Sequence, residues 1–376
     1  IYYEAKGEGP AIVACNGICV STFFWKYLVE YFSPHYNVVV WDYRSHGNSD
    51  PAPDLKNLTM EQNARDLACV MDAVGAEQAL LLGHSMGVQT IFEFYRRFPQ
   101  RVAGLIPVLG AYEKPVSSFL HTDKFAYVFP LLYHFTFAFP WLVNSVVHAL
   151  VRDYIAFPGA KLARFVNPHH IKFKDMQPYF RHLAGQDMRV LFGMGAHMQK
   201  HSARDMLSKM DVPVLVVAGE HDLFTPHRVS AEMAETIPNA ELLTVPKGSH
   251  AALVEQPELM NLRIEKFIRE RLGDSAWIKS PARPARARTP KSKSLAGKLA
   301  AKSVSIPKTP SKKPAAKKSH APAPDPLPRI LKLFKAGQSQ AAVARTLNEQ
   351  GVPTLSGRGR WSGSQVGRLI KKHAAN

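Results

Sequence analysis

A short glycine-flanked motif, GHSMG over residues 83–87, carries the side chain best suited to attack a carbonyl carbon. It follows an apolar run, Ala79–Leu82, and precedes a helix-like run, Val88–Phe98. A serine between two such glycines, at a sharp strand-to-helix turn, is held in a strained backbone conformation that exposes its hydroxyl. The same turn aims the main-chain amide of Met86 at the oxyanion that would develop. This context predicts that Ser85 is a nucleophile.

A serine hydroxyl is a weak nucleophile and needs a general base within hydrogen-bond reach. Of the sixteen histidines, His250 is the best candidate, because it follows the last strand-like run, Glu241–Val245, and precedes a helix-like run. We expect His84, His221 and His46 to be structural or to lie at the rim of the site.

The base in turn needs a carboxylate to orient it. Asp222, in the segment GEHDLFTP, lies just after a strand-like run, and Glu220 two residues earlier is its rival. We prefer Asp222 because Thr225-Pro226 follows closely and would hold the loop rigid. Ser85, Asp222 and His250 together would carry out acyl transfer.

The elements that must position these residues alternate between strand-like and helix-like runs. Over the first 110 residues the strand-like runs are Ala11–Ala14, Asn37–Trp41, Ala79–Leu82 and Val102–Leu109, and the helix-like runs are Thr59–Val74 and Val88–Phe98. The rhythm returns later with Val212–Ala218, Glu241–Val245 and the helix-like run Pro257–Arg271. Such alternation predicts an α/β fold with a mostly parallel sheet and helices on both faces.

The pattern breaks between residues 112 and 210, which we interpret as a helical lid between two parts of the core, 1–111 and 211–273. The lid is rich in aromatic residues, which either bind an apolar substrate or pack the lid's own core. The candidate substrate-binding side chains are Phe23, Phe24, Trp141 and Phe224. Residues 125–151 contain no charged side chain, but prolines, histidines and other polar residues interrupt them, so we expect a buried aromatic lid rather than a membrane contact.

Residues 1–272 resemble the α/β-hydrolase superfamily, in its lid-bearing branch of esterases and lactonases. The resemblance covers about 70% of the chain and rests on five segments in the order NGICVSTFFW, VVVWDYRSHGNSD, GHSMG, GEHDLFTP and GSHAALVEQP. The chain order Ser, Asp, His is also the order that this fold uses. The resemblance therefore implies an α/β-hydrolase fold with the predicted triad at the carboxyl ends of its strands.

Two loops depart from the family pattern. In the first, Asn16 stands where the family usually has histidine, and the resemblance makes the main-chain amide of Ile18 the second oxyanion donor beside Met86. In the second, WDYRSHGNSD, Ser45 stands where glycine is usual. The resemblance gives Asp42, Arg44 and Ser49 of this second loop a structural role below the site.

The resemblance implies an enzyme that hydrolyses an ester or lactone of an apolar small molecule, with no cofactor and no metal. A serine nucleophile argues against epoxide hydrolases and haloalkane dehalogenases, which need a carboxylate there. Cofactor-free perhydrolases and carbon–carbon bond hydrolases use the same triad, so they remain alternatives. A DNA-associated regulator that uses the fold to sense a ligand is a further alternative.

Three cysteines without a framework spacing (Cys15, Cys19 and Cys69) argue against a secreted disulfide scaffold and lack the second pair that a zinc site needs. We expect reduced thiols in a cytoplasmic protein. No signal peptide is visible.

The charge of the chain is concentrated at its carboxyl end. Residues 1–274 hold 26 Lys and Arg against 28 Asp and Glu, whereas residues 275–376 hold 22 against 2. Residues 274–327 are built mainly from Lys, Arg, Pro, Ala and Ser, a composition that cannot bury enough apolar surface to fold, so we expect a disordered linker. A segment of this charge predicts a nucleic-acid partner for residues 275–376, with binding through counterion release, and association with the nucleoid.

Apolar periodicity returns in residues 328–376, which predict a small helical module. The pattern GQSQAAVARTLNEQGVPT followed by GRGRW resembles the DNA-binding recombinase domain of large serine recombinases, over about 12% of the chain. No recombinase catalytic domain accompanies it. The basic residues expected to meet phosphates are Arg358, Arg360, Arg368, Lys371 and Lys372.

Overall fold

The computed structural model describes the greater part of the chain, namely residues 1–117, Thr122, 124–273, Ile330, Leu333, 340–350, Val352 and Val366. The chain divides into two compact units, Ile1–Pro290 and Lys291–Asn376. The first unit contains every strand assigned among the described residues, and it is the unit that carries the predicted triad.

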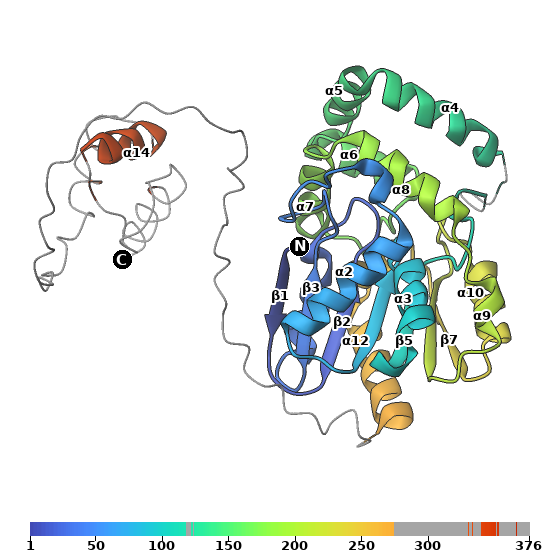
Figure 1. The fold of residues 1–376 in the computed structure, drawn as a ribbon. Helices are drawn as coiled ribbons and strands as arrows, with labels where there is room; N and C mark the ends of the chain where they lie inside the picture. Colours follow the sequence, from blue (N-terminus) through green and yellow to red (C-terminus); the bar gives the residue numbers. More distant parts are fainter. Residues whose placement is uncertain are drawn as a thin grey trace, which may run out of the picture. The chain divides into compact units, whose positions relative to one another are not determined.

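A seven-stranded sheet forms the centre of the first unit (Figure 1). The strands are β1 Tyr3–Lys6, β2 Ala11–Cys15, β3 Asn37–Trp41, β4 Ala79–His84, β5 Val102–Val108, β6 Val214–Gly219 and β7 Ala240–Val245. Their order is β1-β3-β2-β4-β5-β6-β7; β1 pairs antiparallel with β3, and all other pairs are parallel. The parallel α/β-hydrolase fold predicted from the sequence is therefore confirmed.

Helices cover both faces of the sheet, because the central strands are apolar on both sides and leave no face for water. One face packs against α2 Met60–Ala73, α3 Met86–Arg97 and α10 His227–Thr236, and the other against α1 Lys26–Phe32, α11 Ala252–Glu255 and α12 Pro257–Phe267. Thr59 caps α2 by accepting a hydrogen bond from the amide of Gln62 at 3.1 Å. A π-helical turn, Ile268–Leu272, ends the described part of this unit.

The predicted runs and the observed elements agree closely in the core. Asn37–Trp41 and the start of Ala79–His84 have the expected bounds, and the expected helix at Val88–Phe98 begins earlier, at Met86. The sequence did not predict β1, because this edge strand is exposed along its whole length and therefore lacks an apolar signal. It pairs with only one neighbour, as an edge strand does.

A helical cap between β5 and β6 covers one end of the sheet (Figure 1). Its helices are α4 Phe125–Ala138, α5 Pro140–Leu150, α6 Asp153–Leu162, α7 Phe173–Leu183, α8 Met188–Lys200 and α9 Arg204–Leu207. The cap is tied to the core by an ion pair between Lys26 and Asp175, and by the hydrogen bond that the side-chain amide of Gln186 donates to the carbonyl of Ser45 at 2.8 Å.

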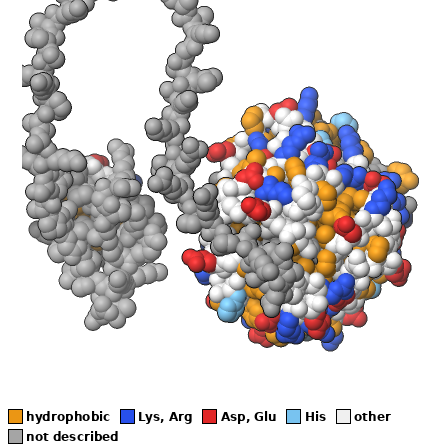
Figure 2. Space-filling view, turned by 60° about the horizontal axis from the view of Figure 1, so that its bottom comes forward, with side chains coloured by type: hydrophobic (Ala, Val, Ile, Leu, Met, Phe, Trp, Pro, Cys, Tyr) orange, Lys and Arg blue, Asp and Glu red, His pale blue; other side chains and the backbone are white. Residues whose placement is uncertain are grey.

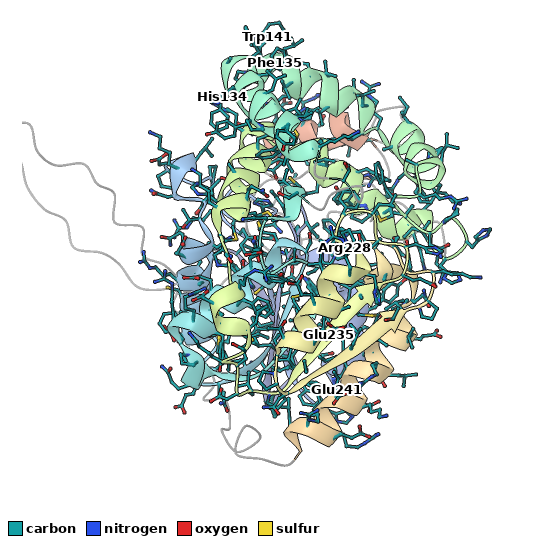
Figure 3. The ribbon with its side chains drawn as sticks, turned by 90° about the vertical axis from the view of Figure 1, so that its right-hand side faces the viewer. His134, Phe135, Trp141, Arg228, Glu235 and Glu241 are labelled. Atoms are coloured by element: carbon teal, nitrogen blue, oxygen red, sulfur yellow. The ribbon has the colours of Figure 1, made fainter. Side chains whose placement is uncertain are left out.

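The outer helices of the cap differ from the expected buried aromatic lid. Thr136 is the one buried residue of α4, and α5 has none. Figure 3 shows Phe135 and Trp141 at the outer end of the domain, far from Glu241 on β7. Among the described residues no single helix is long and apolar enough to cross a bilayer, although α4 and α5, bent by 110° at their junction, pass that test as a pair.

The second unit is described in part. Its helix α14, Gln340–Glu349, packs a small apolar cluster of Ile330, Val343, Ala344, Leu347 and Val366. The five basic residues expected to meet phosphates (Arg358, Arg360, Arg368, Lys371 and Lys372) lie outside the described residues, as does the linker 274–327.

Candidate active site

The turn between β4 and α3 holds Ser85 in an unusual backbone conformation. Its φ is 54° and its ψ is −114°, a region that residues with a side chain rarely adopt. Glycine is required on both sides, because a Cβ at Gly83 would lie 2.3 Å from the carbonyl oxygen of Gly87, and one at Gly87 would lie 2.4 Å from that of Cys15. The strand and the helix can therefore approach each other closely enough to project the Ser85 hydroxyl beyond the sheet.

The three residues proposed as the triad form one hydrogen-bonded row. The hydroxyl of Ser85 lies 2.9 Å from Nε2 of His250, and Nδ1 of the same ring lies 2.8 Å from Oδ2 of Asp222. Because an ionised carboxylate can only accept, Nδ1 carries the proton and Nε2 is left to accept from the serine. This is the tautomer that a general base acting on Ser85 needs.

Asp222 is buried, yet its charge is well supported. Oδ1 accepts hydrogen bonds from the amides of Phe224 at 2.8 Å and Thr225 at 3.0 Å, and Oδ2 accepts one from the Thr225 hydroxyl at 2.8 Å. Burial raises the pKa of Asp222, but the neighbouring His250 and these hydrogen bonds outweigh it, so the pKa is lowered overall. The rival Glu220 is exposed and accepts a hydrogen bond from the amide of Lys247 at 2.7 Å instead.

The predicted oxyanion donors come from two segments beside the nucleophile. Met86 is the first residue of α3, so its amide belongs to the first turn of a helix, where donors are not used within the helix. Ile18 lies in the loop after β2, and the next amide in that loop, of Cys19, donates to Nε2 of His46 at 3.0 Å. In the part of the chain that the structure describes, no hydrogen bond uses the amide of Ile18 or that of Met86.

His46 holds the loop that contains Ile18 in place, and its own ring is fixed in one tautomer. Its Nδ1 donates to the carbonyl of Arg44 at 3.1 Å, which leaves Nε2 free to accept from the amide of Cys19. Burial lowers the pKa of His46 to about 4, so the ring stays neutral under ordinary conditions. The sequence predicted a structural or rim histidine here, and its contacts are structural.

Asn16, which stands where the family usually has histidine, anchors this loop through its side-chain amide. The residue is fully buried, its Oδ1 accepts from the indole nitrogen of Trp25 at 2.8 Å, and its Nδ2 donates to the carbonyl of Trp41 at 2.6 Å. Nδ2 also approaches Oδ1 of Asp42 at 3.4 Å. The loop is therefore anchored to the core through side-chain amide contacts, despite the departure from the family pattern.

The second family loop braces the site from below. Oδ1 of Asp42 accepts from the amide of Thr22 at 3.1 Å, and its Oδ2 accepts from that of Asn48 at 2.9 Å. Arg44 forms two hydrogen bonds of 2.7 Å with the carboxylate of Asp66 on α2. Ser49 closes the loop by donating to the carbonyl of Asp42 at 2.6 Å.

Glu255 supports the His250 loop, and the sequence analysis did not single it out. This buried carboxylate accepts from the hydroxyl of Ser249 at 2.6 Å, from the amide of Ser249 at 3.1 Å and from that of Asn167 at 2.6 Å. A glutamate within the apolar run AALVE was the available signal, because buried carboxylates need partners. The residue joins the cap to the loop that presents the base.

A second histidine, His84, lies directly beneath the catalytic candidate. Its Nε2 donates to the carbonyl of His250 at 3.0 Å, and the two rings lie 5.0 Å apart. Burial, together with the nearby His250, lowers the pKa of His84 to about 3. The neutral ring thus holds the backbone of His250 in place, which agrees with the structural role expected for it.

Three of the four candidate substrate-binding residues lie in the core of the site region. Phe224 stacks on His250 with ring centroids 4.8 Å apart, and Phe24 lies 4.8 Å from the ring of His84. Phe23 meets His182 of the cap edge-on at 6.2 Å. The prediction for the fourth, Trp141, is not supported, because this residue is 70% exposed and lies at the outer end of the cap (Figure 3).

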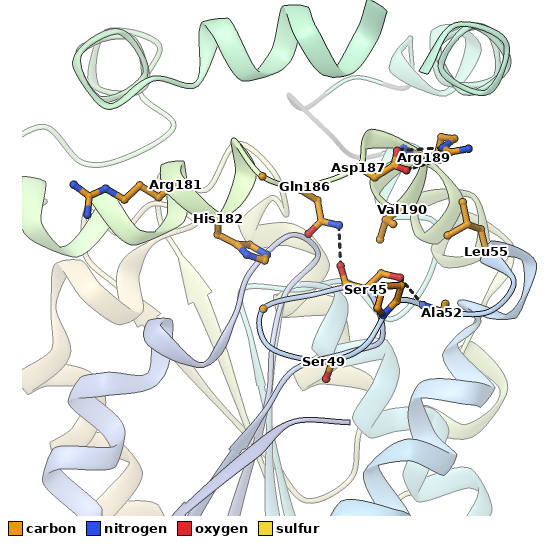
Figure 4. Close-up of a pocket in the computed structure, with 13 residues that line it drawn as sticks. Ser45, Ser49, Ala52, Leu55, Arg181, His182, Gln186, Asp187, Arg189 and Val190 are labelled. Carbon is orange, nitrogen blue, oxygen red and sulfur yellow. Dashed lines mark hydrogen bonds and ion pairs between the residues drawn. The ribbon is translucent and has the colours of Figure 1, made fainter. Parts of the chain in front are cut away.

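A cleft of about 670 Å³ separates the cap from the core at one edge (Figure 4). It is lined by the loop from Ser45 to Leu55 and by residues 181–190 of the cap, and the hydrogen bond from Gln186 to Ser45 crosses it. Ser85 does not line this cleft. Within the described ranges, no group of three or more His, Cys, Asp or Glu side chains is arranged to hold a metal ion.

Known proteins share both the sequence pattern and the fold. A protein of Azorhizobium caulinodans named RutD and described as a carbamate hydrolase is 26% identical over 272 residues, which cover 72% of this chain and 95% of the relative. An esterase of Exiguobacterium antarcticum has a similar structure, with a TM-score of 0.59 at 18% identity over 72% of this chain and 95% of its own. The enol-lactonase of Burkholderia xenovorans matches with a TM-score of 0.56 at 22% identity, over 72% of this chain and 96% of its own.

The model of one family, described as the alpha/beta hydrolase fold, matches residues 10–257. That range runs from β2 to the start of α12. It contains Ser85, Asp222 and His250, whose ring is hydrogen-bonded to both of the other side chains. The match covers well over half of the chain, and this protein is therefore a member of the α/β-hydrolase fold family of enzymes.

Proposed function

We propose that this protein hydrolyses an ester or a lactone of an apolar small molecule through an acyl-enzyme on Ser85. One observation carries the proposal: the ring of His250 lies within 2.9 Å of the Ser85 hydroxyl and within 2.8 Å of the buried Asp222. A serine hydroxyl becomes a useful nucleophile only beside an oriented base, and this row provides one. A ligand sensor would have no need of all three side chains in register.

The reaction follows from these positions. The Ser85 oxygen attacks the substrate carbonyl while its proton passes to Nε2 of His250, and the charged ring is stabilised by Asp222. The amides of Ile18 and Met86 would donate to the resulting oxyanion, each contributing about 3–4 kcal/mol to transition-state stabilisation. His250 then returns the proton to the leaving oxygen, and the carbonyl–oxygen bond breaks. A water molecule, deprotonated by the same ring, releases the acid and regenerates the serine.

The apolar character of the substrate is inferred from the surroundings of the base. Phe224 covers one face of His250, and Phe165 lies 5.2 Å from Phe224 in turn. Aromatic walls beside the reacting atoms favour an apolar acyl or alcohol group. The relatives named above are described as acting on a carbamate, an ester and an enol-lactone, all of which present a carbonyl with a heteroatom leaving group.

Hydrolysis of p-nitrophenyl esters of graded chain length, by wild type and by Ser85→Ala, tests the proposal. We expect Ser85→Ala to abolish turnover, whereas Ser208→Ala, a control at an exposed serine at the end of α9, leaves it unchanged. A fluorophosphonate probe should add its mass to the peptide that contains Ser85. Equal rates for wild type and Ser85→Ala would refute the assignment. If Ser85→Ala is inactive, hydrolysis of aliphatic lactones, measured by the acid that is released, would show whether the substrate is an ester or a lactone.

For the carboxyl-terminal segment we propose binding to nucleic acid through charge. Residues 275–376 hold 22 Lys and Arg against 2 Asp and Glu, a balance that favours polyanions. Retention on duplex DNA by the full chain should fall steeply as salt rises, because bound cations are released from the phosphates. Truncation after Gly273 should remove the retention. Retention that survives the truncation, or that does not respond to salt, would refute this part of the proposal.

A further inference from the structure

The two outer cap helices, α4 and α5, depart from the usual polarity of a surface helix, because most of their exposed side chains are apolar. Polar side chains of such helices normally face water. Here the Asn144 side chain accepts a hydrogen bond from the amide of Met188 at 2.9 Å, and Nε2 of His148 donates to the carbonyl of Gln186 at 3.0 Å. Thr136 is buried and donates to the carbonyl of its own helix. Asn144 and His148 of α5 therefore use their polar groups against the rest of the cap, whereas His134 and Ser145 are exposed.

The outward side of α4 and α5 is mostly apolar, although His134 and Ser145 are also exposed there. Tyr127, Leu131 and Phe135 follow each other at four-residue spacing along α4, and the first two are 80% and 69% exposed. On α5, Trp141 is 70% exposed. The further exposed apolar residues of the two helices are Val128, Phe137, Phe139, Leu142, Val146 and Leu150. A surface with so many exposed apolar side chains marks an interaction site, because single exposed apolar residues are common but such runs are not.

The charges around this surface point to an anionic partner. No charged residue occurs between positions 125 and 151, and exposed cationic side chains, Lys124 and Arg152, stand at the two ends of this stretch. Residues 124–189 as a whole hold eight Lys and Arg against three Asp and Glu, although residues 1–274 are net negative. Figure 2 shows the domain with its lower end in Figure 1 turned forward. On this part of the surface, acidic and basic side chains are mixed among apolar ones.

Neither helix alone is long enough to span a bilayer. At about 1.5 Å per residue, the 14 residues of α4 measure about 21 Å and the 11 residues of α5 about 17 Å, both shorter than a bilayer core of about 30 Å. The 110° bend between them prevents them from adding their lengths. An apolar face with tryptophan and tyrosine, flanked by cations, is instead typical of helices that lie in the membrane interface.

We propose that the outward face of α4 and α5 binds the surface of a lipid bilayer, with a preference for anionic lipid. Tyr127, Leu131 and Trp141 enter the boundary between head groups and acyl chains. Lys124 and Arg152 remain at the level of the phosphates, where long cationic side chains are stable. The hydrogen bonds of Asn144 and His148 hold α5 on the domain while its outer side leaves water. This proposal concerns binding alone and does not depend on the reaction at Ser85.

Co-flotation of the full chain with vesicles tests the proposal, in phosphatidylcholine alone and in phosphatidylcholine with phosphatidylglycerol. The basic carboxyl-terminal segment also attracts anionic lipid, but salt screens that attraction, whereas insertion of apolar side chains persists in salt. We therefore expect wild type to float with both vesicles at high salt, and more strongly with the anionic ones at low salt. The fluorescence of Trp141 should shift to shorter wavelength on binding.

The double variant Leu131→Glu/Trp141→Glu should lose at least tenfold in vesicle affinity at high salt. Both side chains are exposed, so the change removes no core packing, and hydrolysis of a short-chain p-nitrophenyl ester should be unchanged. The matched control is Leu262→Glu on α12, where an exposed leucine lies outside the cap; it should float like wild type.

Equal flotation by wild type and the double variant at high salt would overturn the proposal. So would wild type that does not float at all. A third result would overturn it in favour of a different partner: self-association of wild type without lipid, abolished by the double variant, would show that a second copy of the chain covers this face.

Discussion

Replacing Asp222 with Asn tests the proposed tautomer of His250 directly. The carboxylate accepts hydrogen bonds from Nδ1 of His250, from two backbone amides and from the Thr225 hydroxyl. In Asp222→Asn the side-chain oxygen can still accept the two amides at the Oδ1 position. The new NH₂ group then occupies the Oδ2 position, where it donates to Nδ1. Nδ1 is left without its proton, and Nε2 must carry one instead.

A proton on Nε2 removes the base that Ser85 needs, although the shape of the site is preserved. The expected loss in kcat is about 10⁴-fold, which corresponds to about 5.5 kcal/mol of transition-state stabilisation. The assay is ester hydrolysis at saturating substrate, with thermal unfolding of each variant to confirm that the fold is intact. Activity of Asp222→Asn should recover in part at high pH, where hydroxide can take the serine proton.

The control for this experiment is Glu220→Gln, because Glu220 is the other acid of the same loop and is exposed. It should retain nearly full activity. If Asp222→Asn kept more than about a tenth of wild-type kcat while folded, against the roughly 10⁴-fold loss expected, the orienting role assigned to Asp222 would be refuted. A collapse of activity in Glu220→Gln alone would transfer that role to Glu220.

Three further predictions follow from the loops that surround the nucleophile. Asn16→Ala leaves the buried indole N–H of Trp25 without its acceptor and should lower the free energy of unfolding by about 2–3 kcal/mol. Urea denaturation measures this change, and an unchanged midpoint would contradict the anchoring role. Gly87→Ala places a Cβ 2.4 Å from a backbone oxygen and should abolish activity or folding. The control Gly185→Ala should be tolerated, because its Cβ would meet nothing closer than 3.7 Å. Equal behaviour of the two variants would argue against the tight turn. His46 is neutral in the fold because burial lowers its pKa from 6.5 to about 4. The unfolded chain binds the proton first as pH falls, so His46 stabilises the fold above about pH 6.5 and loses this contribution as pH falls toward 4, by about 2 kcal/mol between about pH 7 and pH 5. Urea denaturation of wild type and His46→Gln at both pH values should show the smaller loss in the variant, and parallel losses would contradict the assignment.

Much of the fold was determined locally and could be predicted from the sequence. Runs such as NVVVW and ALLL are apolar on both sides of a strand, so they indicate parallel strands covered by helices. The GHSMG turn likewise depends on neighbouring residues, because its glycines are required by contacts within a few positions and with the adjacent strand. That the side chains of Ser85, Asp222 and His250 come together could be predicted, because each follows a strand and the carboxyl ends of parallel strands meet at one edge.

Other features depend on contacts between distant segments, and no local pattern encodes them. Glu255 supports the base only because Asn167 of the cap reaches it. Asp222, and not Glu220, lies buried beside His250, a placement that the sequence could only suggest.

The aromatic stretch 125–151 shows the same limit most clearly. Its composition predicted a buried lid, because apolar side chains usually leave water. The tertiary structure instead turns the polar contacts of Asn144 and His148 inward and the rings of Tyr127 and Trp141 outward. Which side of such a mainly apolar helix faces the protein is set by the contacts that the neighbouring helix offers, and only the packed chain contains that information.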